Sequence, residues 1–208
     1  MTAAAMTYDS LLADIQTYSE RRDEPFVSQL PRFVMMAENR IATECRGLGF
    51  KRFVNGILGS SVVEKPARWR ETLSINVTVG TERQTLRERG YEYCREFAPD
   101  ASVVGVPRYY ADYGFEHWLI VPTPDQNYVC EISFHERPEP LSSTNQTSWT
   151  TQYAPQLLLY ATLLEAAPFL KRPDLLQQWQ GMYEAAKNAL AGESGRRMQD
   201  NNATRSVE

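Results

Sequence analysis

The residues best placed for chemistry are two histidines, His117 and His135, on either side of a segment whose alternating pattern predicts a β-hairpin. Across that hairpin the two imidazoles could face each other, with Glu116, Glu131 and Glu136 close by in the sequence. Imidazoles and carboxylates together can bind a transition metal, so the arrangement raises a His/Glu metal site. We favour the simpler interpretation, in which the histidines lie on a strand surface beside solvated carboxylates.

Two other side chains invite a catalytic interpretation. A dyad of Cys130 with a histidine would need a third orienting group and an oxyanion hole, and the sequence indicates neither. Glu165 lies in an apolar stretch where a buried acid could act, but such a glutamate more often lies on a solvated edge or pairs with a basic neighbour. Because the chain also lacks P-loop, GxGxxG, GxSxG and HExxH motifs, we predict no catalytic, cofactor-binding or metal-binding residues.

The bulk composition is that of an ordinary soluble protein. Of 208 residues, 42% are apolar and 23% are charged, and the net charge is −4. An acidic chain of this kind does not offer a global basic surface for gripping nucleic acid. The three cysteines, Cys45, Cys94 and Cys130, have no metal-binding spacing, so we expect reduced, partly buried thiols in an intracellular protein. The N-terminus shows no signal-peptide pattern.

The most apolar stretch, APQLLLYATLLEAAPFLKRPDL at residues 154–175, is interrupted too often by proline and charge to be a membrane span. We predict instead a helix buried on most sides, because its apolar residues do not keep to one stripe. Pro155 suits the first turn of that helix. Pro168 should kink or end it, and Pro173 should begin a second helix.

Helices are expected at both ends of the chain, with strands between them. The apolar periodicity predicts helices over 8–19, 31–46 and 84–97, and a C-terminal helix that ends near Gly192. Short β-like runs occupy much of 50–79. The expected core includes three tryptophans, Trp118, Trp149 and Trp179.

These elements predict an α+β fold, a helical bundle formed by the N- and C-terminal helices with an inserted antiparallel β-rich lobe and an extended C-terminal tail. We place the N-terminal helices of the bundle at 1–48, the β-rich lobe with one helix at 49–148, the C-terminal helix pair at 149–192 and the polar tail at 193–208. The tail has too few apolar residues to fold alone.

Several stretches, taken in order, resemble the head–tail adaptor (connector) proteins of tailed bacteriophages. The first long helix of that family is matched by PFVSQLPRFVMMAENRIATE. Its G-x-P-x-x-Y strand and P-x-P-D hairpin are similar to GVPRYYADYG and HWLIVPTPDQNYVCEISF. Its C-terminal helix pair resembles SWTTQYAPQLLLYATLLEAAPFLKRPDLLQQWQGMYEAAKNAL, so the resemblance spans residues 8–190.

The resemblance implies a non-enzymatic structural protein, about twelve copies of which form a ring below the portal protein. Such a ring extends the DNA channel without binding DNA specifically, and it offers a platform for a tail or nozzle protein. It belongs to the head–tail connector of the virion, assembles in the host cytoplasm and involves no membrane and no cofactor. The family's helical part and C-terminal tail generally meet the portal, and its β lobe is more exposed towards the phage tail. The expected portal contacts are Arg196, Arg197, Met198 and Arg205, and the expected tail-facing hairpin residues are Pro122, Pro124, Asp125 and Gln126.

Two other functions stay open at this point. One is a small cytoplasmic enzyme with a Cys/His or carboxylate site in the β lobe. The other is a small cytoplasmic binding module.

Overall fold

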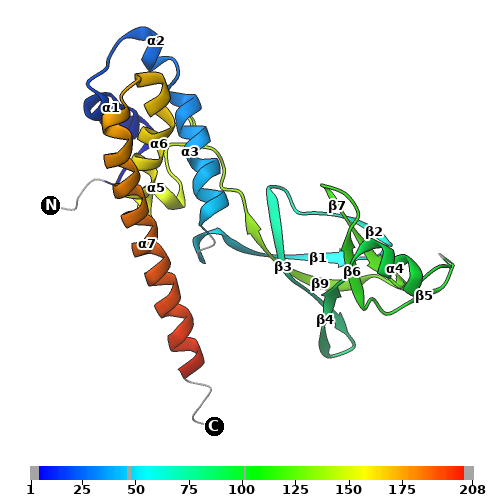
Figure 1. The fold of residues 1–208 in the computed structure, drawn as a ribbon. Coiled ribbons are helices and arrows are strands. Elements are labelled where there is room, and N and C mark those ends of the chain that lie inside the picture. The colour runs from blue at the N-terminus through cyan, green and yellow to red at the C-terminus, as the bar shows by residue number, and fades with distance from the viewer. Residues whose placement is uncertain (1–4, 46–47, 101, 204–208) are drawn as a thin grey trace. The chain divides into compact units, whose positions relative to one another are not determined.

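The computed structural model describes residues 5–45, 48–100 and 102–203, apart from the side chains of residues 48 and 197–203. Within them the chain has an α+β fold, as predicted, with helices at both ends and a seven-stranded sheet between them (Figure 1). The chain divides into two compact units, one of Met1–Phe50 with Arg137–Glu208 and one of Lys51–Glu136. We call them the helical unit and the β unit.

The helical unit is built from both ends of the chain. Its first part contains α1 (Tyr8–Ser19), α2 (Glu24–Val27), α3 (Leu30–Glu44) and a short 3-10 helix, η1 (Leu48–Phe50). Its second part contains α5 (Trp149–Tyr153), α6 (Pro155–Leu170) and α7 (Pro173–Ala203). The bounds of α1 are those predicted, and a capping box of Thr7 and Ser10 begins it.

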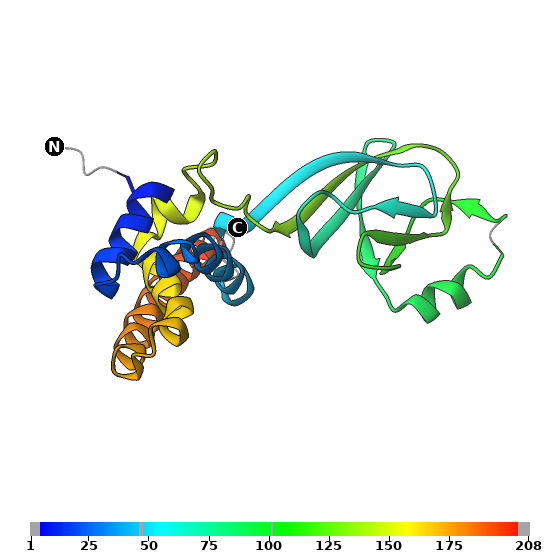
Figure 2. The same ribbon diagram turned by 90° about the horizontal axis from the view of Figure 1, so that it is seen from above.

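Helix α6 forms the centre of this unit, and α1, α3, α5 and α7 pack against it (Figures 1 and 2). The prediction of a helix buried on most sides is confirmed, because buried side chains occur at successive positions through most of its length. Pro155 lies in the first turn, where its missing N–H has no helical partner to lose. The helix continues past Pro168 and ends at Leu170, so this proline lies in the last turn.

Helix α7 begins at Pro173, as predicted, but it does not end near Gly192. It runs on to Ala203 and so includes most of the segment that we expected to be an extended tail. The prediction gave too much weight to Gly192 as a helix end. A glycine costs a helix only about 1 kcal/mol, and the Glu, Arg, Met and Gln residues that follow are good helix formers.

The β unit contains nine strands and one helix. They are β1 (Lys51–Leu58), β2 (Val62–Glu64), β3 (Trp69–Val79), β4 (Glu82–Glu88), α4 (Tyr91–Phe97), β5 (Val104–Gly105), β6 (Tyr109–Asp112), β7 (His117–Val121), β8 (Thr123–Pro124) and β9 (Tyr128–Glu136). Seven strands form a curled sheet (Figure 2), and their order is β1-β9-β3-β4-β6-β7-β2. In addition, β5 pairs with β8. All neighbours in the large sheet are antiparallel except β4 and β6.

Two predictions for this unit are wrong. The helix expected over 84–97 is a strand up to Glu88 and a helix only from Tyr91, because Leu86 fills the sheet core as the partner of Ile75. The hairpin expected around 118–134 does not form, since β7 pairs with β6 and β2 while β9 pairs with β1 and β3. Alternation identified both strands correctly, but it carries no information about which strand pairs with which.

A buried lysine holds the connections of the β unit together. The Lys65 side chain is only 3% exposed, and its Nζ lies 2.7 Å from Asp112 Oδ1. It also donates to the Gly114 carbonyl at 3.0 Å and lies 3.7 Å from the centre of the Trp69 ring. These contacts join the β2–β3 connection to the turn between β6 and β7, so one ammonium group ties together segments distant in sequence.

A second charged group joins strands where the chain enters and leaves the β unit. The Glu136 carboxylate, at the end of β9, accepts from Arg52 Nε at 2.7 Å and from Arg68 Nη2 at 2.6 Å. Arg52 belongs to β1 and Arg68 immediately precedes β3. The last residue of the unit is therefore linked to both strands that flank β9.

We expect Lys65→Met to destabilise the β unit by about 2–3 kcal/mol, because the buried ammonium loses its ion pair with the exposed Asp112, its bond to Gly114 and its cation–π contact. Lys51→Met is the matched control. Its ammonium lies over the exposed Phe53 ring, and its loss should change stability by less than about 0.5 kcal/mol. Urea denaturation of both variants measures the difference, and equal midpoints would contradict a central role for Lys65.

Candidate functional site

The two histidines do not form a site. His117 is exposed at the start of β7, and His135 is buried in β9 between β1 and β3. Because β7 and β9 are not neighbours in the sheet, the facing arrangement that a metal site would need does not form. The favoured interpretation of two surface histidines is correct for His117 and wrong for His135, which is buried. In the described part of the chain, no group of three or more His, Cys, Asp or Glu side chains could hold a metal ion.

Cys130 has the environment of a structural thiol. It is buried in the core of the β unit, and burial raises the pKa of its thiol despite a hydrogen bond with the Gly56 backbone. The thiolate is the nucleophilic form, so this environment makes Cys130 unreactive. Cys130 and His135 are five residues apart on β9, and an odd separation places side chains on opposite faces of a strand. All three cysteines are buried, and none of them forms a disulfide.

Glu165 pairs with a basic neighbour, which was one of the two outcomes expected for it. Its Oε1 accepts from Arg40 Nε at 2.6 Å, and this ion pair joins α6 to α3. The carboxylate is therefore engaged in holding two helices together, which leaves it no catalytic task.

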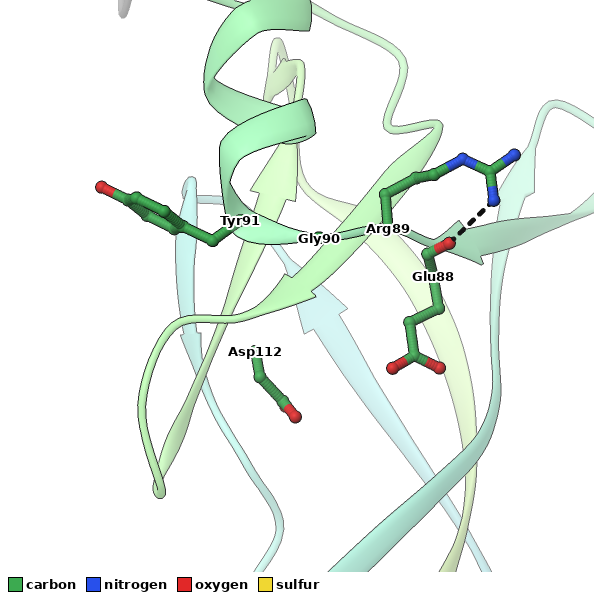
Figure 3. Close-up of a pocket in the computed structure, with 5 residues that line it drawn as sticks. All are labelled: Glu88, Arg89, Gly90, Tyr91 and Asp112. Atoms are coloured by element: carbon green, nitrogen blue, oxygen red, sulfur yellow. Dashed lines mark hydrogen bonds between the residues drawn. The ribbon is translucent and has the colours of Figure 1, made fainter.

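An open hollow of about 550 Å³ lies in the β unit where β4 meets α4, and its lining consists of Glu88, Arg89, Gly90, Tyr91 and Asp112 (Figure 3). The Arg89 and Tyr91 side chains point away from one another. The Glu88 carboxylate accepts from the Tyr110 hydroxyl at 3.4 Å, and the Asp112 carboxylate is bound to Lys65. The polar groups of the hollow thus serve the fold rather than converge on a ligand.

Aromatic and guanidinium groups hold α4 on the sheet. Arg89 lies over the rings of Tyr93 and Tyr109, at 5.6 and 5.8 Å, and Arg95 lies over Tyr91 at 5.2 Å. Cation–π contacts of this kind contribute about 0.5–1 kcal/mol each at exposed sites. The sequence analysis missed this cluster, although Tyr91 and Arg95 have the i,i+4 spacing that brings side chains together on a helix.

The strongest candidate for an interaction surface is an exposed apolar patch on β1 and β9. Phe53, Ile57 and Val129 are 60–63% exposed, and we call these three residues the edge patch. Ile57 and Val129 are paired across the two strands, and Phe53 lies four residues before Ile57 on the same face of β1. Exposed apolar clusters of this kind mark contacts with other macromolecules more often than isolated apolar residues do.

The strand that carries the patch is also open along one side. β1 lies at one end of the sheet order, and among the described strands it pairs only with β9. Its eight residues therefore present backbone N–H and C=O groups that another chain can pair with. The sequence analysis identified this segment as β-like, but its alternation did not reveal that the apolar face would be the uncovered one.

The predicted contact residues fall in several environments. Arg196 is exposed on α7, whereas the side chains of Arg197 and Met198, and Arg205 as a whole, lie outside the described residues. Of the supposed hairpin residues, Pro124 is buried and Pro122 is half-buried. Asp125 and Gln126 are exposed, and the Asp125 carboxylate accepts from the Tyr128 hydroxyl at 2.6 Å.

The chain is similar to a known protein family. A family model described as SU10 adaptor protein matches residues 6–206, which is nearly the whole chain. No curated protein matches it significantly. In the part of the chain that the structure describes, the helices are all too short or too polar to cross a membrane.

Proposed function

The chain belongs to the SU10 adaptor protein family, a family of phage head–tail adaptors, and we propose that it joins the head of a tailed phage to its tail as a structural part of the connector. Family membership implies a virion component that assembles with other virion proteins. The match over residues 6–206 carries the proposal, because it takes in the helices at both ends and the whole β unit. The protein works without catalysis in this role.

In its working form the protein is a ring of about twelve copies between the portal and the tail. Each copy of a closed ring meets its neighbours through two different surfaces, so each copy must expose at least one surface suited to a lasting contact. We assign the edge patch and the open side of β1 to the contact between neighbouring copies. An exposed apolar surface beside an unpaired strand supports this assignment.

The ring extends the channel through which the genome passes. Its net charge of −4 per chain supports a channel wall along which DNA slides without being gripped. The C-terminal part of α7 attaches to the portal, and the β unit offers the platform for a tail or nozzle protein.

The alternative of a small enzyme or binding module with a Cys/His site has lost its basis. Cys130 and His135 lie on opposite faces of β9, and His117 lies on a strand that is not adjacent to β9 in the sheet. The function that remains best supported is therefore structural.

Native mass spectrometry of the purified chain, alone and mixed with the portal protein of the same phage, tests this function. We expect a high-order ring at least in the mixture, because the portal provides a circular template for copies that associate weakly by themselves. A chain that stays monomeric and never joins the portal would contradict the adaptor function.

A double variant, Phe53→Ser with Ile57→Ser, tests the edge patch. Each substitution removes an exposed apolar side chain worth on the order of 1 kcal/mol in a contact, so the association constant of each contact should fall about tenfold or more. The matched control is Val103→Ser, which removes a similarly exposed apolar side chain from a loop of the same unit. The ring fraction at several concentrations gives the measurement, and equal loss in both variants would refute the assignment of the contact to β1.

Removal of residues 193–208 tests the C-terminal contact. The truncated chain should stay folded, because the buried α7 residues Trp179 and Tyr183 remain in place. Its attachment to the portal should weaken, which a pull-down titration with the portal protein measures. Unchanged attachment would show that the portal contact lies elsewhere, and Arg196→Gln in the full chain separates loss of charge from loss of helix.

A further inference from the structure

The helical unit contains a carboxylic acid in its apolar core. Glu38 lies on α3 and is only 6% exposed, on the same side of the helix as the buried residues Val34, Ile41 and Ala42. A carboxylate is rarely buried to this degree unless it is paired with a cation or neutralised. The neighbours of Glu38 therefore decide its charge.

Those neighbours offer one hydrogen bond and no cation. Glu38 Oε2 accepts from the Leu141 N–H at 3.1 Å, and Oε1 has no hydrogen-bond partner among the described residues. On the elements around it, Tyr8 of α1 is a neutral phenol whose pKa is raised, chiefly by burial. Glu165 of α6 is bound to Arg40, which leaves that guanidinium already engaged.

The connection between β9 and α5 brings two further charged residues, Arg137 and Glu139, into the same unit. The pKa of Glu38 is shifted by burial and, in the opposite sense, by the Leu141 N–H. Burial raises the pKa of Glu38 to about 7. A single backbone donor is therefore too little to keep an ionised carboxylate in this place.

The hydrogen bond from Leu141 has structural importance because of where Leu141 lies. It belongs to the connection of residues 137–148, which carries the chain from β9 back to α5. Two residues of the connection bind the helices. One is Leu141, through its buried side chain and its bond to Glu38. The other is Gln146, which accepts from the backbone N–H groups of Tyr8 at 2.8 Å and Asp9 at 3.1 Å.

We propose that Glu38 is a pH-sensitive latch, which holds the Leu141 part of the connection on the helical unit while the carboxyl is protonated and releases it when the carboxyl ionises. Release exposes the carboxylate to water and loosens the connection around Leu141. The latch thereby sets how firmly this part of the connection is held on α3. The device is independent of the proposed adaptor function.

The direction of the pH effect follows from the raised pKa. The closed state binds the proton more tightly than the open state, whose carboxyl has an ordinary pKa near 4.5. Closing is therefore most favourable below about pH 4.5 and weakens as the pH rises towards 7. The opening equilibrium should increase by up to about tenfold per pH unit across this window and level off above it.

Hydrogen exchange of the full-length chain between pH 5 and 8, corrected for the intrinsic pH dependence of amide exchange, tests the latch. Peptides covering residues 137–148 should lose protection by about tenfold or more over this range, whereas peptides from α6 should not. In Glu38→Gln the protection should not change with pH, because the amide cannot ionise. The matched control is Glu44→Gln on the same helix, whose carboxylate is bound to Tyr183 and Lys187, and it should keep the wild-type profile.

A second measurement covers the case in which Glu38→Gln does not fold. Carboxyl ¹³C chemical shifts of the wild-type protein should show one glutamate that titrates near pH 7. A Glu38 signal that titrates near pH 4.5 overturns the proposal. So does protection of residues 137–148 that is unchanged with pH in the wild type, or a pH dependence that persists in Glu38→Gln.

Discussion

The helical unit depends on one constraint, which is that α6 is apolar around most of its circumference and must be covered on most sides. No single neighbour can do this, so α1 and α3 cover it from one end of the chain and α7 covers it from the other. Two of its polar side chains have hydrogen-bond partners. The Thr162 hydroxyl donates to the Leu158 carbonyl in the same helix at 2.8 Å, and Glu165 pairs with Arg40 of α3. Because both ends of the chain are needed to bury α6, whatever lies between them must leave the helical unit and return to it.

The β unit is the segment that leaves and returns, and it is organised around polar anchors as well as an apolar core. Lys65 joins connections that are distant in sequence, and Glu136 links the two strands beside β9. Both anchors consist of a charged group with several partners, a geometry in which ion pairs contribute more than isolated surface pairs do. The edge patch on β1 and β9 differs from these, since its three apolar side chains remain largely exposed.

Sequence reasoning succeeded where a pattern depends on near neighbours and failed where it depends on distant ones. The α+β class, the bounds of α1 and the burial of α6 follow from local apolar periodicity and the positions of proline. The pairing of β7 with β6 and β2 does not follow from the local sequence, because a strand shows the same alternation of apolar and polar residues whichever strand lies beside it. The strand character of residues 84–88 was hidden for a related reason, since Leu86 gains its burial from Ile75 on another strand. At the candidate site, the sequence indicated that Glu165 could pair with a basic residue, but it did not identify that residue as Arg40. The uncovered face of β1 could not be predicted, because the exposure of a strand face depends on which other parts of the fold cover it.

The pairing of β1 with β9 also determines how the β unit responds to mechanical force. The chain enters the unit at Lys51 and leaves it at Glu136, and these two residues lie at the same end of one antiparallel ladder. A pull on the unit along the strands is thus shared between two covalent chains that run side by side. The Glu136 carboxylate, bound to Arg52 and Arg68, lies at the point where that tension enters the sheet and resists peeling of the first backbone pairs. A load on this unit would therefore be carried by two chain connections rather than by one.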